Sequence, residues 1–119
     1  MAPFLSILVV EDDTAVRDVL IRVLSEKGFG VLTASDGYDA LRILADRPVD
    51  VLFTDLILPG MDGVQLAKQA KLIRPGIKVL FATGYPQLAT TRDAIRYGQV
   101  IYKPLRATEI AQAIENLAA

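Results

Sequence analysis

Short apolar runs alternate with amphipathic segments along the chain, and this alternation is what most restricts the possible fold. The run Ser6–Val10 (SILVV) is rich in β-branched residues, which is typical of a strand buried on both faces. The segment after it carries apolar residues at the i, i+3, i+4, i+7 spacing of a helix with one buried face. Five such strand–helix units predict an α/β fold with an open, doubly wound parallel sheet.

Turn and cap signals indicate where these elements end. Gly28 is expected to end the first helix in the left-handed conformation, and Asp62 with Gln65 is expected to form a capping box for the third helix. The stretch 86–97 has few large apolar residues at helical spacing, so the fourth helix is expected to be short or irregular. The expected strands are residues 6–10, 29–34, 51–53, 78–82 and 100–102, and the last helix covers 107–117.

The same periodicity predicts which helical side chains face the sheet. In the first helix these are Val16, Val19, Leu20, Val23 and Leu24, in the second Leu41, Leu44 and Ala45, and in the last Ile110, Ile114 and Leu117.

The composition excludes several kinds of chemistry. The chain has no cysteine, which excludes disulfides, thiol catalysis and thiolate metal sites. It has no histidine, which removes the usual neutral-pH general base and the commonest zinc ligand. Carboxylates, hydroxyls, lysine, arginine and bound ions must therefore carry any reaction.

Charge and length restrict the possible partners and the domain count. With 13 basic and 14 acidic residues, a broad electrostatic contact with nucleic acid or with an anionic membrane is not expected. The apolar run 5–10 is too short for a membrane span or a signal sequence, so a soluble cytoplasmic protein is expected. We expect one domain over residues 1–119.

Polar residues follow the strands at positions where a doubly wound sheet binds its ligands, beyond the carboxyl ends of the strands. Three of these residues are acids, and carboxylate ligands without imidazole or thiolate favour Mg²⁺ or Mn²⁺ over zinc. Taken singly, each residue has an ordinary alternative, because acids after a strand are often only helix N-caps. A cap, however, has no use for a lysine or a threonine at the same edge. The residues are Glu11, Asp12, Asp55, Thr83 and Lys103.

Four motifs together resemble the receiver domain of two-component response regulators, over residues 6–117. The resemblance implies a flavodoxin-like fold with strand order 2-1-3-4-5, which would bring the acids after strands one and three into one pocket. The stretch 81–85 (FATGY) also resembles a subgroup of stand-alone and hybrid-kinase receivers. The motifs are Val9-Val10-Glu11-Asp12-Asp13, Thr54-Asp55-Leu56-Ile57-Leu58-Pro59-Gly60-Met61-Asp62-Gly63, Phe81-Ala82-Thr83-Gly84 and Tyr102-Lys103-Pro104.

The resemblance also implies a role for each site residue. Asp55 would be the phosphoacceptor, with the Thr83 hydroxyl and the Lys103 ammonium each holding a phosphoryl oxygen. Asp12, Asp55 and the backbone carbonyl of Ile57 would bind Mg²⁺ directly, and Glu11 would act mainly through water. The Lys103–Pro104 peptide bond would be cis.

As a receiver, the chain would be a signalling domain and not a classical enzyme, although it would carry out its own phosphorylation and dephosphorylation. The phosphoryl group would come from phosphohistidine on a histidine kinase or a histidine phosphotransfer protein, and a further protein partner would read the signal. We expect a monomer or weak dimer. Bulky Ile57 and Tyr85 at the pocket mouth would make hydrolysis slow.

The sequence leaves three questions open. Val100 stands where receivers often carry a tyrosine or phenylalanine that swings inward on activation, so we hypothesise that activation orders or shifts residues 86–97 in place of that ring movement. A receiver-like module that binds partners without being phosphorylated is the main alternative function. The sequence also does not separate a stand-alone regulator from the receiver of a hybrid kinase.

Overall fold

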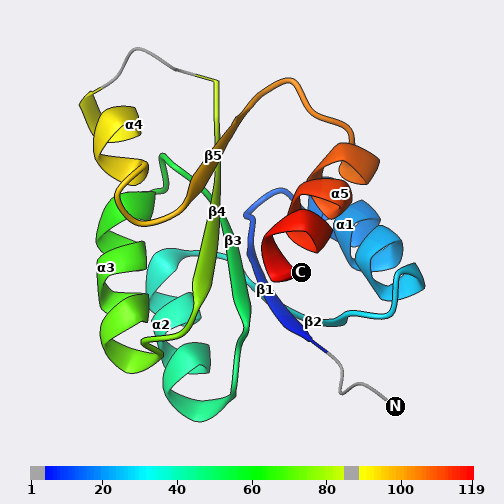
Figure 1. Ribbon diagram of the computed structural model, residues 1–119, viewed down its shortest axis with the longest axis horizontal. Coiled ribbons are helices and arrows are strands. Elements are labelled where there is room, and N and C mark those ends of the chain that lie inside the picture. Colours follow the sequence, from blue (N-terminus) through cyan, green and yellow to red (C-terminus); the bar gives the residue numbers. More distant parts are fainter. Residues whose placement is uncertain (1–4, 85–88) are drawn as a thin grey trace.

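A parallel five-stranded sheet in the order β2-β1-β3-β4-β5 forms the centre of the computed structural model (Figure 1). The structure describes residues 5–84 and 89–119, leaving out the side chain of residue 89. Along the chain the elements are β1 (Ser6–Val10), α1 (Thr14–Glu26), β2 (Gly30–Ala34), α2 (Gly37–Asp46), β3 (Val51–Asp55), α3 (Gly63–Ile73), β4 (Lys78–Thr83), α4 (Ala89–Ala94), β5 (Gln99–Tyr102) and α5 (Ala107–Ala118).

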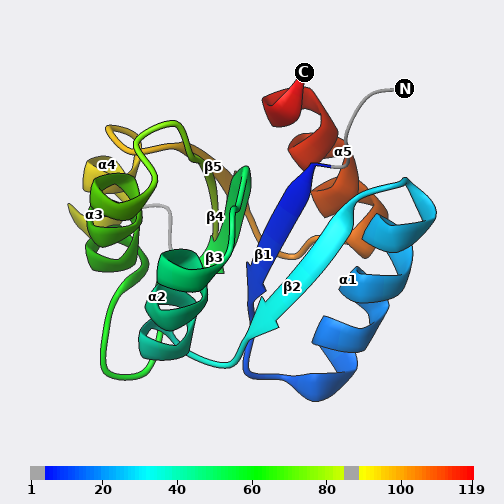
Figure 2. The ribbon, with the colours of Figure 1, turned by 90° about the horizontal axis from the view of Figure 1, so that it is seen from below.

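Helices cover both faces of the sheet, as the two orthogonal views in Figures 1 and 2 show. Helices α2, α3 and α4 lie on one face, and α1 and α5 lie on the other. Because successive strand residues point to opposite faces, Leu8 and Leu52 pack under the first layer, while Ile7 and Val51 pack under the second. Two separate hydrophobic clusters result, one on each face.

The predicted fold class, strand order and strand positions are confirmed, with strand ends differing from the prediction by one or two residues. Gly28 ends α1 with φ of 92°, as expected. The capping box of α3 is present: Asp62 Oδ1 accepts from the Gln65 N–H at 2.8 Å, and Gln65 Oε1 accepts from the Asp62 N–H at 3.2 Å.

Some predicted inner faces are wrong. Val16 and Val19 in the first half of α1 are 42% and 40% exposed, while Leu20 and Leu24 further along are buried. The helix is amphipathic as predicted, but its first half borders an open groove beside α5. In α2, Ala45 is exposed and Ala40 is buried in its place.

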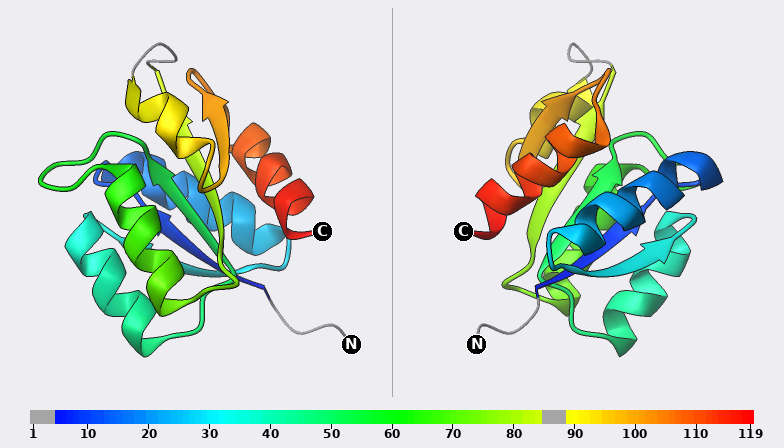
Figure 3. Two further views of the ribbon diagram at one scale, coloured as in Figure 1. Left: turned by 60° about the vertical axis from the view of Figure 1, so that its left-hand side comes forward. Right: turned by 90° about the vertical axis from the view of Figure 1, so that its right-hand side faces the viewer.

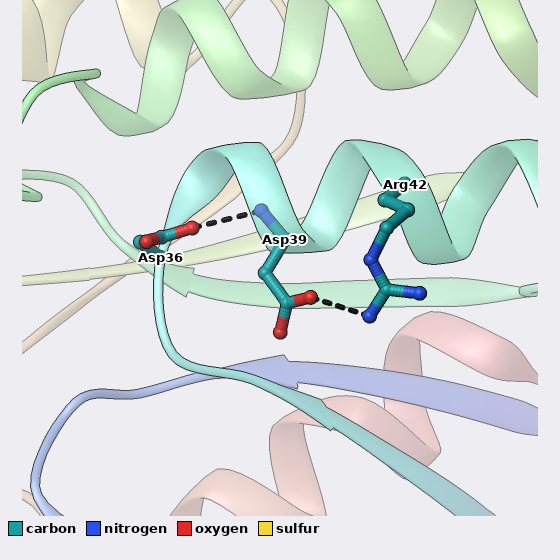
Figure 4. A network of polar contacts seen from close by, with 3 residues as sticks. All are labelled: Asp36, Asp39 and Arg42. Atoms are coloured by element: carbon teal, nitrogen blue, oxygen red, sulfur yellow. Dashed lines mark hydrogen bonds and ion pairs between the residues drawn. The ribbon is translucent and has the colours of Figure 1, made fainter.

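An aspartate caps the start of α2 and a charged pair lies on its surface (Figure 4). Asp36 Oδ1 accepts a 2.8 Å hydrogen bond from the Asp39 N–H, which satisfies one of the unpaired donors of the first turn. The Asp39 carboxylate in turn pairs with Arg42 Nη2 at 2.6 Å. Both contacts lie within α2 and its cap, so they stabilise the start of this helix.

The fourth helix is short, as expected: α4 has six residues, and its Thr91 and Ala94 are buried. Residues 85–88, which include Tyr85 and the first part of the predicted weak segment, lie outside the described residues. After α4 the chain reaches β5 through Gly98, where a Cβ would collide with the Val79 carbonyl. Only glycine allows the backbone to approach β4 this closely.

Candidate functional site

Four of the predicted side chains, together with Ile57, meet at the carboxyl edge of the sheet. Backbone hydrogen bonds fix the strand ends that carry them: the Lys103 N–H donates to the Thr83 carbonyl at 2.8 Å, and the Leu56 N–H donates to the Ala82 carbonyl at 2.9 Å. The Glu11 N–H likewise donates to the Ala34 carbonyl at 3.0 Å, which ties the end of β1 to β2. The site is therefore built on strand ends, which are rigid supports for chemistry.

An ion pair lies at the centre of this site. Lys103 Nζ is 2.8 Å from Asp55 Oδ1, and the two side chains are 47% and 23% exposed. The Lys103–Pro104 peptide is cis, as the resemblance implied. Asp55 is thus a partly buried carboxylate with a cation beside it.

The charges of Asp55 and Lys103 both act on the Glu11 carboxylate. Burial raises the pKa of Glu11 above its ordinary value of 4.5, and the nearby Asp55 raises it further, while Lys103 lowers it. Asp12 and Asp13 add smaller upward effects. Repulsion between the Glu11 and Asp55 carboxylates is the condition that a bound cation relieves.

The three acids after β1 have separate positions. Asp13 is the N-cap of α1: its Oδ1 accepts from the N–H groups of Ala15 and Val16, so the capping alternative holds for this residue. Asp12 is exposed and lines neither hollow described below. Within residues 5–84 and 89–119, no three His, Cys, Asp or Glu side chains are arranged closely enough to form a metal cluster.

The residues nevertheless fit Mg²⁺. Magnesium keeps most of its waters and is commonly held by one or two carboxylates, so a dense cluster of acids is not required. Asp55 and Glu11 supply carboxylate oxygens at one hollow, and Ile57 follows at the start of the next loop. Every side-chain donor in this set is oxygen, which is the chemistry that Mg²⁺ prefers.

Asp55 and Lys103 lie between two hollows. A small one of about 220 Å³ is lined by Asp55, Ile57, Thr83, Lys103 and their neighbours. Thr83 is buried, and its place in this lining brings a hydroxyl to the same hollow as the ammonium group. A carboxylate, a hydroxyl and a cation around one small space suit a tetrahedral oxyanion such as a phosphoryl group.

The larger hollow, of about 520 Å³, opens on the α1–α5 side. It contains Glu11, Asp55 and Lys103 at one end and continues over apolar side chains of α1, β3 and the chain before α5. A neighbouring hollow of about 320 Å³ extends it along α1 to Val19. We name this combined surface the α1–α5 groove; its apolar residues include Val16, Val19, Leu20, Phe53, Leu105 and Ile110.

The α1–α5 groove was not predicted from the sequence. Its residues have the ordinary hydrophobic periodicity of a helix or a strand. That periodicity does not indicate that α1 and α5 leave a groove between them. The one available signal is that Val16 lies in the first turn of α1, three residues after the capping Asp13 and at the end of the helix nearest the site.

Position 100, where receivers often carry a tyrosine or phenylalanine that swings inward on activation, is a valine in this chain. Val100 is half-buried and packs against the cluster under α2, α3 and α4. Tyr102, two residues later on the same side of β5, is 48% exposed. Tyr97 packs on the same cluster as Val100, and Lys68 Nζ lies 5.6 Å from the centre of its ring.

The fold and this edge define a class of protein: a doubly wound α/β domain with an aspartate, a threonine and a lysine around one hollow at the carboxyl edge of its sheet. Residues 7–115 match the family model of the response regulator receiver domain. The chain belongs to that family.

Two known relatives extend over nearly the same length. The chain is 34% identical over 113 residues to the response regulator receiver protein CpdR of Brucella abortus, covering 93% of this chain and 94% of the relative. It is 31% identical over 112 residues to sporulation initiation phosphotransferase F of Bacillus subtilis, covering 92% and 90%.

A solved receiver structure agrees with the fold. The CheY-like receiver domain protein of Methanospirillum hungatei superimposes with a TM-score of 0.87 and 28% identity, covering 96% of this chain and 93% of that one. The chain is therefore a two-component signalling receiver. Receivers in general work with Mg²⁺ and with histidine kinases or phosphotransfer proteins, and the domain is a signalling module and not a classical enzyme. None of the described helices is long and apolar enough to cross a membrane.

Proposed function

We propose that Asp55 accepts a phosphoryl group from phosphohistidine on a histidine kinase or histidine phosphotransfer protein. The observation that carries this proposal is the 2.8 Å pair between Asp55 and Lys103 at a hollow that Thr83 also lines. An Asp55 oxygen would form the new P–O bond while the P–N bond to the donor imidazole breaks, and its electron pair stays on the imidazole nitrogen. The chain itself needs no histidine for this step.

The surrounding residues would act by position and charge. Phosphoryl transfer passes through a loose transition state with charge on the equatorial oxygens, so countercharge and alignment do most of the work. The Lys103 ammonium would move from Asp55 to a phosphoryl oxygen, and the Thr83 hydroxyl would donate to another. Asp12, Asp55 and the Ile57 carbonyl would hold Mg²⁺, with Glu11 acting through water. When bound, Mg²⁺ supplies countercharge to the phosphoryl oxygens.

The α1–α5 groove supports a docking route for the protein donor. It runs from Asp55 and Lys103 over apolar residues to Val19, so a donor seated on it would bring its phosphohistidine to the phosphoacceptor. Val16 and Val19 are large apolar side chains left in water, which is typical of an interaction surface. A donor helix with apolar residues on one face would fit this groove.

Dephosphorylation would be slow. Ile57 lines the small hollow and is 52% exposed, and its side chain has no group that could activate a water molecule. Tyr85, the second bulky residue expected at the pocket mouth, lies outside the described residues.

We further propose one receiver domain over residues 1–119, a cytoplasmic location and a monomer or weak dimer.

Intact-mass spectrometry tests the central step. The protein is incubated with acetyl phosphate, with and without Mg²⁺, beside Asp55→Asn and the control Asp46→Asn, whose carboxylate is exposed at the end of α2. We expect one Mg²⁺-dependent phosphoryl group in the unsubstituted protein and in the control, and none in Asp55→Asn. The decay of the phosphorylated mass in the same samples measures the rate of hydrolysis.

A phosphohistidine protein donor provides the second arm of the experiment. Failure with both the small and the protein donor would overturn the proposal and favour the alternative of an interaction module that is not phosphorylated. Equal phosphorylation of Asp55→Asn would place the phosphoacceptor elsewhere.

A further inference from the structure

One fully buried hydroxyl lies directly before the proposed phosphoacceptor. Thr54 is 0% exposed, and its neighbours across the sheet are apolar: Val10 pairs with it on β1 and Phe81 on β4. A hydroxyl in such surroundings destabilises the fold unless it makes a hydrogen bond. Its partner is the main-chain carbonyl of Asp55, to which Thr54 Oγ1 donates at 2.9 Å.

The Asp55 carbonyl lies where the β1–β3 ladder ends. The last pair of that ladder is Val10 with Thr54, so Asp55 lies beyond the part of β3 that β1 pairs with. Gly63, the first residue of α3, closes another side of this carbonyl, because a Cβ there would be 2.6 Å from its oxygen. A partly enclosed carbonyl needs a donor from the protein, and the Thr54 hydroxyl supplies it.

This hydrogen bond completes the hold on the peptide group that follows Asp55. The N–H of the Asp55–Leu56 peptide donates to the Ala82 carbonyl at 2.9 Å, and its C=O accepts from Thr54. With the N–H bond alone, the peptide could still tilt about that bond. The bond from Thr54 restricts this tilt and thereby fixes the ψ angle of Asp55.

The ψ angle acts directly on the carboxylate of the same residue. The rotamers open to a side chain depend on its own φ and ψ, so a fixed carbonyl restricts the directions in which the Asp55 carboxylate can point. The direction it takes brings Oδ1 to 2.8 Å from Lys103 Nζ. A nucleophile already held in place reacts faster, because less ordering remains before the transition state.

We propose that Thr54 is a positioning residue for phosphoryl transfer: its buried hydroxyl holds the Asp55 carbonyl and, through the ψ angle of that residue, the carboxylate that would accept the phosphoryl group. This inference rests on the proposed function, because it assigns a role to the residue before the phosphoacceptor. Thr54 lines neither hollow of the site, so it would act through Asp55.

Two substitutions separate the hydroxyl from the packing of the side chain. Thr54→Val removes the hydroxyl and keeps the branched shape, whereas Thr54→Ser keeps the hydroxyl and removes a methyl group from the core. If the side chain only fills space, serine should be the more harmful replacement, because it leaves a cavity. If the hydroxyl positions Asp55, serine should keep what valine loses.

The experiment measures the rate of phosphorylation by acetyl phosphate in saturating Mg²⁺, by intact-mass spectrometry, together with the urea midpoint of each protein. Thr54→Val should react about fivefold more slowly than the unsubstituted protein, which is the effect of one lost hydrogen bond. Thr54→Ser should react at the unsubstituted rate, although its urea midpoint should be lower.

Thr33→Val on β2 is the matched control and should also react at the unsubstituted rate. The Thr33 side chain makes no hydrogen bond within residues 5–84 and 89–119. Thr54→Ala provides a second comparison that does not depend on the folding of Thr54→Val. It differs from Thr54→Ser only in the hydroxyl, and it should be about fivefold slower than that variant.

Equal rates with and without the hydroxyl, in the valine or in the alanine comparison, overturn the inference. Rates that follow the urea midpoints, with Thr54→Ser as slow as Thr54→Val, overturn it as well, and so does an equal loss in Thr33→Val. These results leave the proposed function standing, because the unsubstituted protein is still phosphorylated. If that protein accepts phosphate only from a phosphohistidine protein, the same rates are measured with that donor. If it accepts none from either donor, the proposed function fails and the inference fails with it.

Discussion

The two helix layers differ in how they pack on the sheet: α2, α3 and α4 lie on one face, and α1 and α5 lie on the other (Figure 3). Within the described chain, the cluster under α2, α3 and α4 contains 17 buried residues, and the cluster under α1 and α5 contains 11. The second layer also leaves the α1–α5 groove, which reaches Asp55 and Lys103 at one end. The first layer instead contacts the β3–α3 loop through Gly37 and Tyr38.

This difference separates two tasks. The layer of α2, α3 and α4 packs against the sheet and contacts the tip of the loop that follows Asp55 through Gly37 and Tyr38. The layer of α1 and α5 leaves the α1–α5 groove open, and a partner can approach the Asp55 carboxylate through it. Two measurements compare the layers directly, and a third tests the charge of Glu11 at the end of the α1–α5 groove.

The largest effect should be on stability, and it should differ between two buried leucines. Leu66 in α3 belongs to the filled cluster, whereas Leu20 in α1 lines the α1–α5 groove. Leu66→Ala should cost about 4 kcal/mol of the free energy of unfolding, since it leaves a closed cavity. Leu20→Ala should cost about 2.5 kcal/mol, near the lower end of the range, because its new space joins a hollow that is already open. Urea denaturation measures both, and an equal or larger loss in Leu20→Ala would contradict the comparison.

A smaller effect should appear in phosphoryl transfer from a protein donor. Val19→Asp places a charge in the α1–α5 groove, and an unfavourable charged contact within the interface should slow transfer about tenfold. Phosphorylation by acetyl phosphate should not change, because Val19 lies at the far end of the groove from Asp55.

Leu72→Asp is the matched control for this prediction. Leu72 is an exposed apolar residue at the end of α3, in the opposite layer, so its replacement should leave both reactions unchanged. Equal slowing in the two variants would argue against docking on the groove.

The smallest effect should be a pH-dependent gain in stability in Glu11→Gln. The pKa of Glu11 is raised in the folded protein by burial and then by Asp55. Protonated Glu11 therefore favours the folded state below the ordinary pKa of 4.5, and this contribution is lost as the pH rises through the raised pKa.

Glutamine mimics the protonated form, so Glu11→Gln should melt at a higher temperature than the unsubstituted protein at pH 7. The gain should disappear below about pH 4.5, and Mg²⁺ should reduce it at neutral pH by relieving the same repulsion. Glu26→Gln, at the exposed end of α1, controls for the loss of one negative charge. A gain that is equal at both pH values would contradict this account.

Much of the fold follows from the sequence because local signals agree with it. The capping box of Asp62 and Gln65, the left-handed Gly28 and the buried β-branched strands depend on neighbouring residues alone. The strand order does not follow from local signals. It came from the resemblance to receivers, and with it came the expectation that Asp55 and Lys103 meet.

Other features of the site depend on how the layers pack. Periodicity indicates that Val16 and Leu20 share one face of α1. It does not indicate that Val16 stays exposed while Leu20 is buried. The contact between Tyr38 and Gly60 joins two segments 22 residues apart, and neither segment alone indicates it. Such contacts arise only after the sheet has brought the helices together.

The close approach at Gly98 has a consequence for variation in this chain. The backbone there lies against the Val79 carbonyl, so no residue with a side chain fits unless β5 moves away from β4. Because β5 leads directly to Lys103, displacement of the strand would carry the lysine away from Asp55. In a library of all single substitutions selected for signalling, position 98 should therefore accept as few replacements as the phosphoacceptor itself, although it takes no part in the chemistry.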